Sequence, residues 1–332
     1  MHYESERFVA VQAVLKACLL CRAIQASLVS EETMSKKDNS PVTVADFGAQ
    51  AVINLELMRA FPKDPITAEE DAGDLSILEN AKVKGKVLHH AKAVLPGFTE
   101  EQIISAIDYG SHDGGAKGRF WTLDPIDGTK GFLRREQYAI ALALIENGEV
   151  VLGVLGCPDL PVRANHPDED KGCLFIAVKG QGARVRSFND PTETQITVTN
   201  IVDPSMASFC ESVESAHSSH SDAALITEIL GVAAPPVRID SQCKYAVIAR
   251  GDASVYLRLP TRADYVEKIW DHAAGWIIVK EAGGEVTDIS GRPLDFSLGR
   301  GLDRNKGVVA TNGKLHSRVI GAVRQVLNPE KR

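Results

Sequence analysis

Residues 121–129 read Trp121-Thr122-Leu123-Asp124-Pro125-Ile126-Asp127-Gly128-Thr129. The first part predicts a strand, and Pro125 has a fixed φ and no N–H, so we expect the chain to leave the strand there. Gly128 allows the backbone to approach a ligand closely, and Asp124 and Asp127 can then face the same point. Hard oxygen ligands on a rigid turn suit Mg²⁺, which also takes substrate phosphate. An Asp-rich surface turn is the alternative interpretation.

Three further acidic segments are candidates to complete such a site. Glu69-Glu70-Asp71 follows a short apolar stretch, and adjacent acids at a strand end repel one another unless solvent or a cation intervenes. A solvated loop is the alternative there. Asp271 precedes a small-residue helical run, and Asp46 begins the helical run 47–59. Each is also a candidate for a simple helix N-cap, although a helix N-terminus favours phosphate as well.

Taken in order, the acidic pair at 69–70, DPxDGT at 124–129 and WDxAAG at 270–275 resemble the motifs of the inositol monophosphatase superfamily. This superfamily consists of lithium-sensitive, Mg²⁺-dependent phosphatases. The similarity extends from about Phe8 to Val326. Within the superfamily, the chain is most similar to the 3′(2′),5′-bisphosphate nucleotidases of fungi and plants. The segments that support this are 114–121, 128–134, 137–139, 153–161, 217–220 and 240–245.

The resemblance implies a metal site built from four acidic side chains and one backbone carbonyl. These ligands are Glu70, Asp124, Asp127, Asp271 and the carbonyl oxygen of Ile126. Asp46 and Thr129 resemble the pair that handles the proton of the attacking water. The family uses up to three Mg²⁺ ions, and in such sites one ion lowers the pKa of a bound water while another stabilises the leaving oxygen.

The resemblance also implies a set of substrate-binding residues, which are Gly128, Thr129, His220, Ser241, Lys244, Arg258 and Asp271. Lys244 and Arg258 would hold the phosphate that is not cleaved, since Arg binds phosphate through two parallel hydrogen bonds and Lys acts as a point charge. Ser241 and His220 would supply donors. Structural alternatives remain open: Arg258 on a strand facing solvent, Lys244 on a loop surface and His220 in a loop.

Composition is that of a globular enzyme. With 332 residues we expect one large or two moderate domains. A net charge of −7 argues against non-specific binding to nucleic acid or to an anionic membrane surface. We expect no membrane span, because no run of about 18 apolar residues is evident, and the polar N-terminus fits no signal or transit peptide. The prediction is a cytoplasmic enzyme for a small-molecule substrate, as a monomer or weak dimer.

Six cysteines are scattered along the chain. Cys18-x-x-Cys21 resembles a redox or zinc half-site, but it lies in an amphipathic run where i,i+3 spacing places both thiols on one helix face. No second Cys/His pair has zinc spacing. We therefore interpret this pair as structural, and scattered thiols fit a reducing compartment.

Periodicity predicts an α/β chain with helices over 8–28, 47–60, 99–106, 223–230 and 318–326, and the helix over 99–106 is expected to open with Thr99 as its cap and an acidic first turn. Strands are predicted over 138–145 and 150–156, joined by Asn147-Gly148, which is a strong hairpin signal. The resemblance implies the layered α/β sandwich of inositol monophosphatase-like sugar phosphatases, with the active site between two parts. We place these parts at residues 1–157, with most metal ligands, and 158–332, with Asp271 and the nucleotide-binding residues.

Three functions are compatible with the motifs. The resemblance favours hydrolysis of adenosine 3′,5′-bisphosphate to AMP and phosphate, with 3′-phosphoadenylyl sulfate as a further candidate substrate, in support of sulfur assimilation and salt tolerance. The second is an inositol polyphosphate 1-phosphatase or inositol monophosphatase, which the segment 240–244 disfavours. The third is a non-catalytic phosphate-binding regulator, which the complete set of oxygen ligands disfavours. One departure from the family pattern is the charged Arg135-Glu136 near the catalytic turn, which we interpret as a solvated pair.

Overall fold

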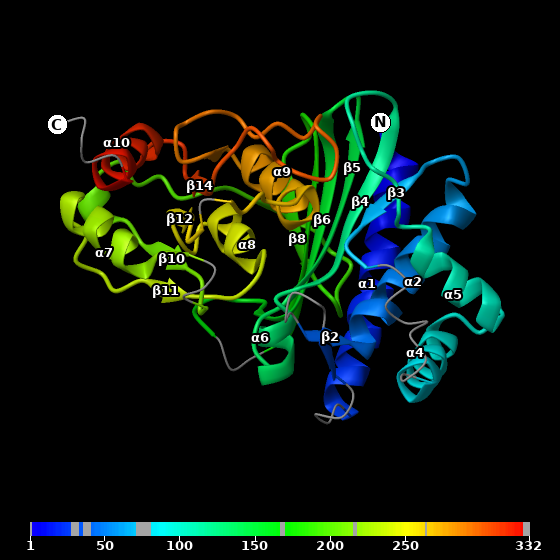
Figure 1. The fold of residues 1–332 in the computed structure, drawn as a ribbon. Helices are drawn as coiled ribbons and strands as arrows, with labels where there is room; N and C mark the ends of the chain where they lie inside the picture. Colours follow the sequence, from blue (N-terminus) through cyan, green and yellow to red (C-terminus); the bar gives the residue numbers. More distant parts are fainter. Residues whose placement is uncertain are drawn as a thin grey trace.

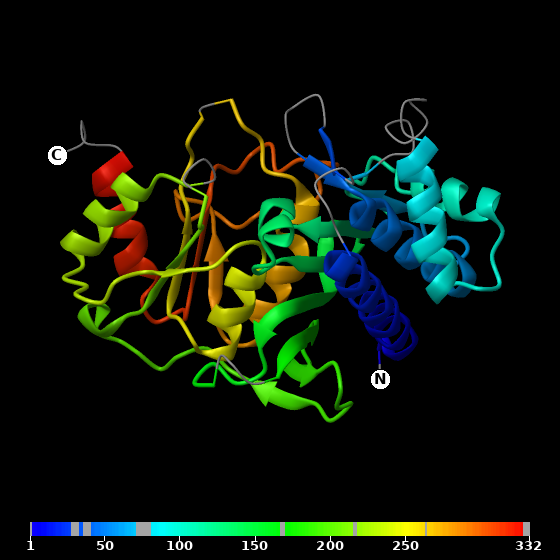
Figure 2. The ribbon, with the colours of Figure 1, turned by 90° about the horizontal axis from the view of Figure 1, so that it is seen from below.

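The computed structural model describes residues 2–27, 33–35, 41–70, 81–166, 170–214, 218–262 and 264–327. Helices and sheets alternate in layers across the molecule (Figure 1). A seven-stranded and a five-stranded sheet are separated by one helical layer, and further helices cover the outer face of each sheet. Figure 2 shows the same order of layers from below. The predicted layered α/β fold is therefore confirmed.

The seven-stranded sheet has the order β3-β4-β5-β6-β7-β8-β9. Its strands are β3 (Ile66–Ala68), β4 (Arg119–Asp127), β5 (Ala139–Glu146), β6 (Glu149–Pro161), β7 (Lys171–Val178), β8 (Ala183–Ser187) and β9 (Thr194–Ile196). β3 is parallel to β4, and the other neighbours are antiparallel. The predicted hairpin joins β5 and β6, where Asn147 and Gly148 have φ values of 52° and 81°, as a type I′ turn requires.

The five-stranded sheet has the order β11-β10-β12-β14-β13. Its strands are β10 (Phe209–Glu211), β11 (Val237–Arg238), β12 (Val255–Arg258), β13 (Glu285–Thr287) and β14 (Val308–Thr311). β10 is parallel to both β11 and β12, whereas β14 is antiparallel to β12 and β13. A separate antiparallel pair consists of β1 (Thr33–Ser35) and β2 (Pro41–Thr43).

Two helices, α8 (Cys243–Arg250) and α9 (Ala273–Glu281), lie between the sheets (Figure 1). The large sheet is covered by α1 (Glu4–Ser27) and α2 (Val44–Ala60), with α4 (Ala81–Val94) and α5 (Glu100–Asp108) beyond them, and the small sheet by α7 (His220–Ile229) and α10 (His316–Leu327). The shortest helical segments are the α-helix α6 (Thr129–Arg134) and the 3-10 helices η3 (Pro204–Met206) and η4 (Ile269–Asp271). As predicted, Thr99 caps α5, in a capping box with Gln102.

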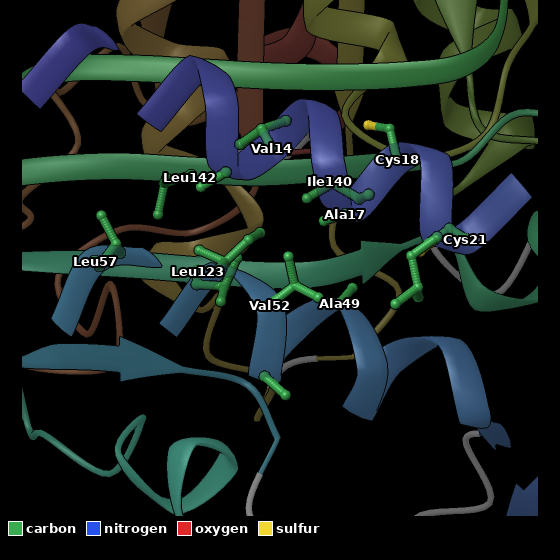
Figure 3. Close-up of a cluster of buried hydrophobic side chains, with 14 of the residues drawn as sticks. Val14, Ala17, Cys18, Cys21, Ala49, Val52, Leu57, Leu123, Ile140 and Leu142 are labelled. Carbon is green, nitrogen blue, oxygen red and sulfur yellow. The ribbon is translucent and has the colours of Figure 1, made fainter. Parts of the chain in front are cut away.

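The core between α1, α2 and the large sheet consists of small and branched side chains. Figure 3 shows Val14 and Cys18 of α1 close to Ile140 and Leu142 of β5. Gly156 of β6 lets α1 pack this closely, because a Cβ there would lie 2.3 Å from Cys18 Sγ. Leu123 and Ile126 of β4 belong to the same cluster, so the strand that carries the acidic turn packs against this core.

Helix α1 is long and apolar enough to cross a membrane by length and composition alone, although Lys16 and Arg22 interrupt its apolar sequence. Half of its most apolar window is buried inside the protein. The spacing of Cys18 and Cys21 places both thiols in this buried face, as predicted, and burial raises the pKa of both. All six cysteines are buried and free. The CxxC motif is therefore part of the core.

The predicted division between residues 157 and 158 falls inside β6, which pairs with β5 as far as Gly156 and with β7 as far as Pro161, with a register shift after Cys157. The chain passes from the large sheet to the small one between Ile196 and Phe209. Sheet membership therefore divides the chain later than the predicted boundary, because a long antiparallel hairpin follows the glycine- and proline-rich segment.

Candidate active site

The acidic turn lies at the carboxyl end of β4. Contrary to the prediction, β4 does not end at Pro125 but continues to Asp127. The pairing with β5 shifts register between Asp124 and Asp127. A bulge leaves a residue out of the hydrogen-bond ladder, so it tolerates a proline without an N–H. The bulge bends the strand and presents both carboxylates at its end.

Gly128 follows with a φ of 92° and begins α6. A Cβ at this position would lie 2.9 Å from the Cβ of Ser241, so both the backbone conformation and the space favour glycine. Ser241 itself has a φ of 64°, which is uncommon for a residue with a side chain. Gly128, which was predicted to let the backbone approach a ligand, therefore also lets the backbone segments at Gly128 and Ser241 come into contact beside the acidic turn.

Asp124 lies at the centre of a group of carboxylates. It is buried, and burial together with repulsion from Glu69, Asp127, Asp271 and Asp46 raises the pKa of its carboxyl well above the usual range. Within the described part of the chain, its Oδ1 atom is buried without a hydrogen-bond partner. A buried, unpaired carboxylate oxygen among other acids is costly unless a cation binds it. This donor set of hard oxygens fits divalent Mg²⁺.

Asp127 faces both acidic and basic groups. Burial raises the pKa of its carboxyl to about 6, although Lys244, Arg258 and a hydrogen bond from the backbone N–H of Gln242 lower it. The hydroxyl of Thr129 donates a hydrogen bond to the carbonyl oxygen of Ile126 over 3.4 Å. The predicted carbonyl ligand and the predicted proton-handling hydroxyl thus lie together in this turn.

The acidic pair follows β3, as predicted. Gln50 of α2 fixes Glu70 by accepting a hydrogen bond from its N–H over 3.1 Å and donating to its carbonyl oxygen over 2.6 Å. Glu69 is the member of the pair whose charge raises the pKa of Asp124, Asp127 and Asp271. The resemblance implies only Glu70 of this pair as a ligand, and the effect of Glu69 on the three aspartates makes it a second candidate.

Asp46 and Asp271 come from two other elements. Asp46 is buried in the first turn of α2, which begins at Val44, so it is not the N-cap. Asp271 ends η4, and His272 is the N-cap of α9, so the simple N-cap interpretation is wrong here as well. Burial and the charges of Asp127 and Glu69 raise the pKa of Asp271 well above the usual range, although Arg258 lowers it.

Lys244 lies in the first turn of α8 and is buried, so it is not a loop surface residue. Its Nζ donates a hydrogen bond to the carbonyl oxygen of Ile239 over 3.3 Å and lies 5.3 Å from the ring centre of Tyr256. Burial lowers the pKa of Lys244, although the charge of Asp127 raises it. A buried cation with few partners beside an acidic group is suited to binding an anion.

Arg258 ends β12, and its side chain is 20% exposed, so it does not simply face solvent. Its Nε and Nη2 bind the two carboxylate oxygens of Glu267 over 3.0 and 2.8 Å. Its Nη2 also lies 3.7 Å from Asp271 Oδ2. The structure therefore brings a predicted substrate residue directly beside a predicted metal ligand.

His220 is the first residue of α7, and its Nε2 lies 2.9 Å from the carbonyl oxygen of Ser212. The hydroxyl of Ser218, two residues earlier, donates to Leu257 O and accepts from Leu259 N, on either side of Arg258. Ser241 Oγ accepts from the N–H of Cys243 over 3.2 Å. His220 thus lies two residues after Ser218, whose hydroxyl is anchored on both sides of Arg258. The contact described for the ring of His220 is with the backbone carbonyl of Ser212.

Tyr265 was not predicted as a site residue. Its side chain is 44% exposed, and Arg258 Cζ lies 6.0 Å from its ring centre. An exposed aromatic ring beside an arginine that is predicted to bind phosphate offers a flat surface for stacking. No motif marks this tyrosine in the sequence, because its position depends on the return of the chain from β12 to η4.

The charged departure Arg135-Glu136 is part of an ion-pair cluster. Arg135 is the C-cap of α6, with a φ of 60°. Glu136 pairs with Arg134 over 2.7 Å, and Arg134 also binds Glu214 and Asp240. The expected solvated pair therefore involves Arg134 rather than Arg135, and it connects α6 to the segment that precedes Ser241.

Sequence comparison matches this chain to known proteins along nearly its whole length. The profile of the Inositol monophosphatase family matches residues 2–328. The 3′(2′),5′-bisphosphate nucleotidase of Emericella nidulans is 44% identical, with 98% of this chain and 99% of that protein covered. The 3′(2′),5′-bisphosphate nucleotidase of Dictyostelium discoideum is 46% identical, with 96% of each chain covered.

Solved structures resemble the fold. The IMPase of Thermotoga maritima has a TM-score of 0.65 at 24% identity, with 96% of both chains covered. The inositol monophosphatase from Anabaena has a TM-score of 0.63 at 20% identity, with 100% of both chains covered. At these identities the likeness concerns the arrangement of helices and sheets.

Proposed function

Because this chain belongs to the inositol monophosphatase family, we propose that it is a Mg²⁺-dependent 3′(2′),5′-bisphosphate nucleotidase that converts adenosine 3′,5′-bisphosphate to AMP and phosphate. One observation carries the proposal: buried acids and buried bases share a single site. The charges of Asp127 and Asp271 act on Asp124, while Lys244 acts on Asp127 and Arg258 acts on both Asp127 and Asp271. An enzyme that hydrolyses a monophosphate needs the acidic half of the site, which includes the aspartates. A second phosphate on the substrate accounts for the basic half, which consists of Lys244 and Arg258.

The acidic half would hold the metal. Its ligands would be Asp124, Asp127, Asp271, the carbonyl oxygen of Ile126 and carboxylates of the pair Glu69-Glu70. Bound Mg²⁺ supplies a water of lowered pKa and stabilises the leaving oxygen. The raised pKa of Asp124 and its unpaired Oδ1 support a cation there. Asp46 and Thr129 would hold the proton of the attacking water.

The basic half would hold the phosphate that is not cleaved. Lys244 would act as a point charge and Arg258 as a planar donor of several hydrogen bonds. Gly128, Ser241 and His220 would border the substrate, and the exposed ring of Tyr265 would stack against the base. The names of the curated relatives support this substrate class over inositol phosphates.

Further properties follow from the family resemblance and belong to the same proposal. The enzyme would be inhibited by Li⁺ and would use up to three Mg²⁺ ions. It would also remove the 3′-phosphate of 3′-phosphoadenylyl sulfate, and so support sulfur assimilation and salt tolerance.

A substrate panel tests the proposal. Phosphate release is measured from adenosine 3′,5′-bisphosphate, adenosine 2′,5′-bisphosphate, 3′-AMP, inositol 1-phosphate and inositol 1,4-bisphosphate, each with Mg²⁺ and with EDTA. We expect the highest kcat/KM for the nucleotide bisphosphates, and no turnover in EDTA. A higher kcat/KM for either inositol phosphate, or undiminished turnover in EDTA, would overturn the proposal.

A further inference from the structure

Three buried side chains form a hydrogen-bonded chain that leads away from Arg258. Glu267 binds Arg258 Nε through Oε1 over 3.0 Å and Nη2 through Oε2 over 2.8 Å. The same Oε2 lies 3.1 Å from His272 Nε2. On the other side of the imidazole, His272 Nδ1 lies 2.8 Å from the hydroxyl of Tyr245. The exposed fractions of Glu267, His272 and Tyr245 are 5%, 0% and 1%.

Each hydrogen bond in this series of side chains has a defined donor and acceptor. Burial raises the pKa of Glu267, but Arg258 and His272 together outweigh it and bring the pKa to about 2, so the carboxylate only accepts. His272 must therefore donate from Nε2. In the tautomer that donates from Nε2, Nδ1 accepts, so the hydroxyl of Tyr245 donates to it over 2.8 Å. Every member thus has one defined role.

This series of hydrogen-bonded side chains holds the guanidinium of Arg258 while leaving several of its N–H groups available. Nε–H donates to Glu267 Oε1 and Nη2 forms an ion pair with Oε2, which engages at most two of about five N–H groups that an arginine offers. In the part of the chain that the structure describes, the remaining donors of Arg258 have no hydrogen-bond partner. Asp271 Oδ2 lies 3.7 Å from Nη2, so Arg258 is adjacent to the predicted metal site. An arginine fixed in this way loses little further side-chain entropy on binding an anion.

The same residues could be mistaken for a metal site. Ligand atoms of Glu267, Asp271 and His272 all lie within 4.8 Å of one another. However, both oxygens of Glu267 already bind the positive charge of Arg258, and His272 Nε2 donates to that carboxylate. A protonated imidazole nitrogen cannot act as a metal ligand. The cluster is therefore better explained as a support for Arg258.

We propose that Glu267, His272 and Tyr245 are positioning residues that hold Arg258 in place for the uncleaved phosphate, and so set the preference for bisphosphates over monophosphates. This inference rests on the proposed function. Glu267 fixes the plane of the guanidinium, His272 fixes the carboxylate, and Tyr245 fixes the tautomer and the orientation of His272. None of the three needs to touch the substrate.

The test compares adenosine 3′,5′-bisphosphate with 3′-AMP, which has the same cleaved phosphate but lacks the second one. For Glu267→Gln we expect KM for the bisphosphate to rise roughly tenfold, because a charged hydrogen-bond pair is lost. The kcat for the bisphosphate and kcat/KM for 3′-AMP should stay near the wild-type values. Tyr245→Phe should shift KM in the same direction by a smaller factor.

Two controls separate positioning from folding. Tyr138→Phe removes another buried hydroxyl, which has no hydrogen-bond partner within the described residues, and it should leave both substrates unaffected. In an Arg258→Met background, Glu267→Gln should cause no further loss of bisphosphate preference, since coupled residues are not additive. Tyr245→Phe, which leaves Glu267 in place, keeps the inference testable even where Glu267→Gln folds poorly.

Equal losses on both substrates, or an unchanged KM for the bisphosphate in both Glu267→Gln and Tyr245→Phe, would overturn the inference. Failure of the proposed function looks different: the wild-type enzyme itself would show no preference for the bisphosphate over 3′-AMP. The two failures are therefore distinguished by the wild-type measurement alone.

Discussion

The backbone N–H of Gln242 donates a hydrogen bond to the carboxylate of Asp127, across 115 residues of sequence. This bond joins the start of α8 to the end of β4. It sets Lys244, two residues after Gln242, at a defined position relative to the acidic turn. The close approach of Gly128 and Ser241 occurs at the same junction. The acidic and basic halves of the site are thus held together by backbone contacts.

Asp124→Asn should fold but lose most of its activity. The swap keeps the shape of the side chain but removes the charge of a predicted metal ligand, so we expect kcat to fall by roughly a hundredfold or more. In EDTA the thermal unfolding midpoint should be no lower than that of wild type, because a buried carboxylate repelled by its neighbours has been removed. Phosphate release and thermal unfolding measure the two effects. The control is Asp170→Asn, at an exposed position. Near-wild-type turnover of Asp124→Asn at saturating Mg²⁺ would contradict the metal assignment.

The stability of the metal-free protein should fall as pH rises from about 4 to about 6. The folded-state pKa of Asp127 is about 6, above its ordinary value of 3.8, so in this range the folded state binds more protons than the unfolded state. The free energy of unfolding should decrease with pH by up to about 3 kcal/mol from this group. Urea unfolding in EDTA across this range measures the slope. Asp127→Asn should flatten it, and an unchanged slope in that variant would exclude Asp127 as its source.

Lys244→Met should reduce binding of a bisphosphate much more than binding of a monophosphate. Losing a charged hydrogen-bond partner costs roughly 1.5–3 kcal/mol, a factor of about ten to over a hundred in affinity. The measurement is kcat/KM for adenosine 3′,5′-bisphosphate against 3′-AMP, with Lys117→Met, at an exposed position, as control. Equal losses on both substrates would mean that Lys244 supports the metal centre or the fold.

Gly275→Ala should destabilise the protein, whereas Gly321→Ala should not. A Cβ at Gly275 would lie 2.2 Å from Tyr245 Cδ2, which is packed in the core, so α8 and α9 would have to move apart. Such overpacking costs roughly 1–3 kcal/mol. Gly321 of α10 has nothing within 4 Å of an added Cβ, so alanine there should stabilise the protein by roughly 0.5–1 kcal/mol. Denaturant unfolding of the pair gives the comparison, and similar stabilities for the two variants would contradict the described packing of α8 against α9.

Li⁺ should inhibit turnover at concentrations where Na⁺ or K⁺ at equal ionic strength has little effect. The family resemblance motivates this expectation, and the crowded carboxylates around Asp124 offer a small hard cation a suitable set of ligands. Initial rates of phosphate release are measured over a dose series of LiCl, NaCl and KCl at fixed Mg²⁺. Superimposable curves for the three salts would refute the expectation.

Features set by a few neighbouring residues could be predicted from the sequence. The Asn147-Gly148 hairpin and the Thr99 cap follow from backbone preferences that act over a few residues. The acidic turn was also found, because Asp124 and Asp127 are close in sequence. The continuation of β4 through Pro125 was missed, since the bulge that accommodates the proline depends on the pairing of β4 with β5.

Whether a polar residue is buried, and beside which partner, was decided by packing between distant elements. From the sequence, Lys244 is expected at the surface, and its burial depends on the position of α8 between the two sheets. From the sequence, Glu69 is expected in a solvated loop, and its effect on the site depends on the proximity of η4 and β4. The chain from Arg258 through Glu267 and His272 to Tyr245 has no local signature. Local preferences act over a few residues, whereas these contacts depend on hydrophobic burial that brings remote segments together. The residue types alone therefore indicate the chemistry, and the tertiary structure selects which of them meet.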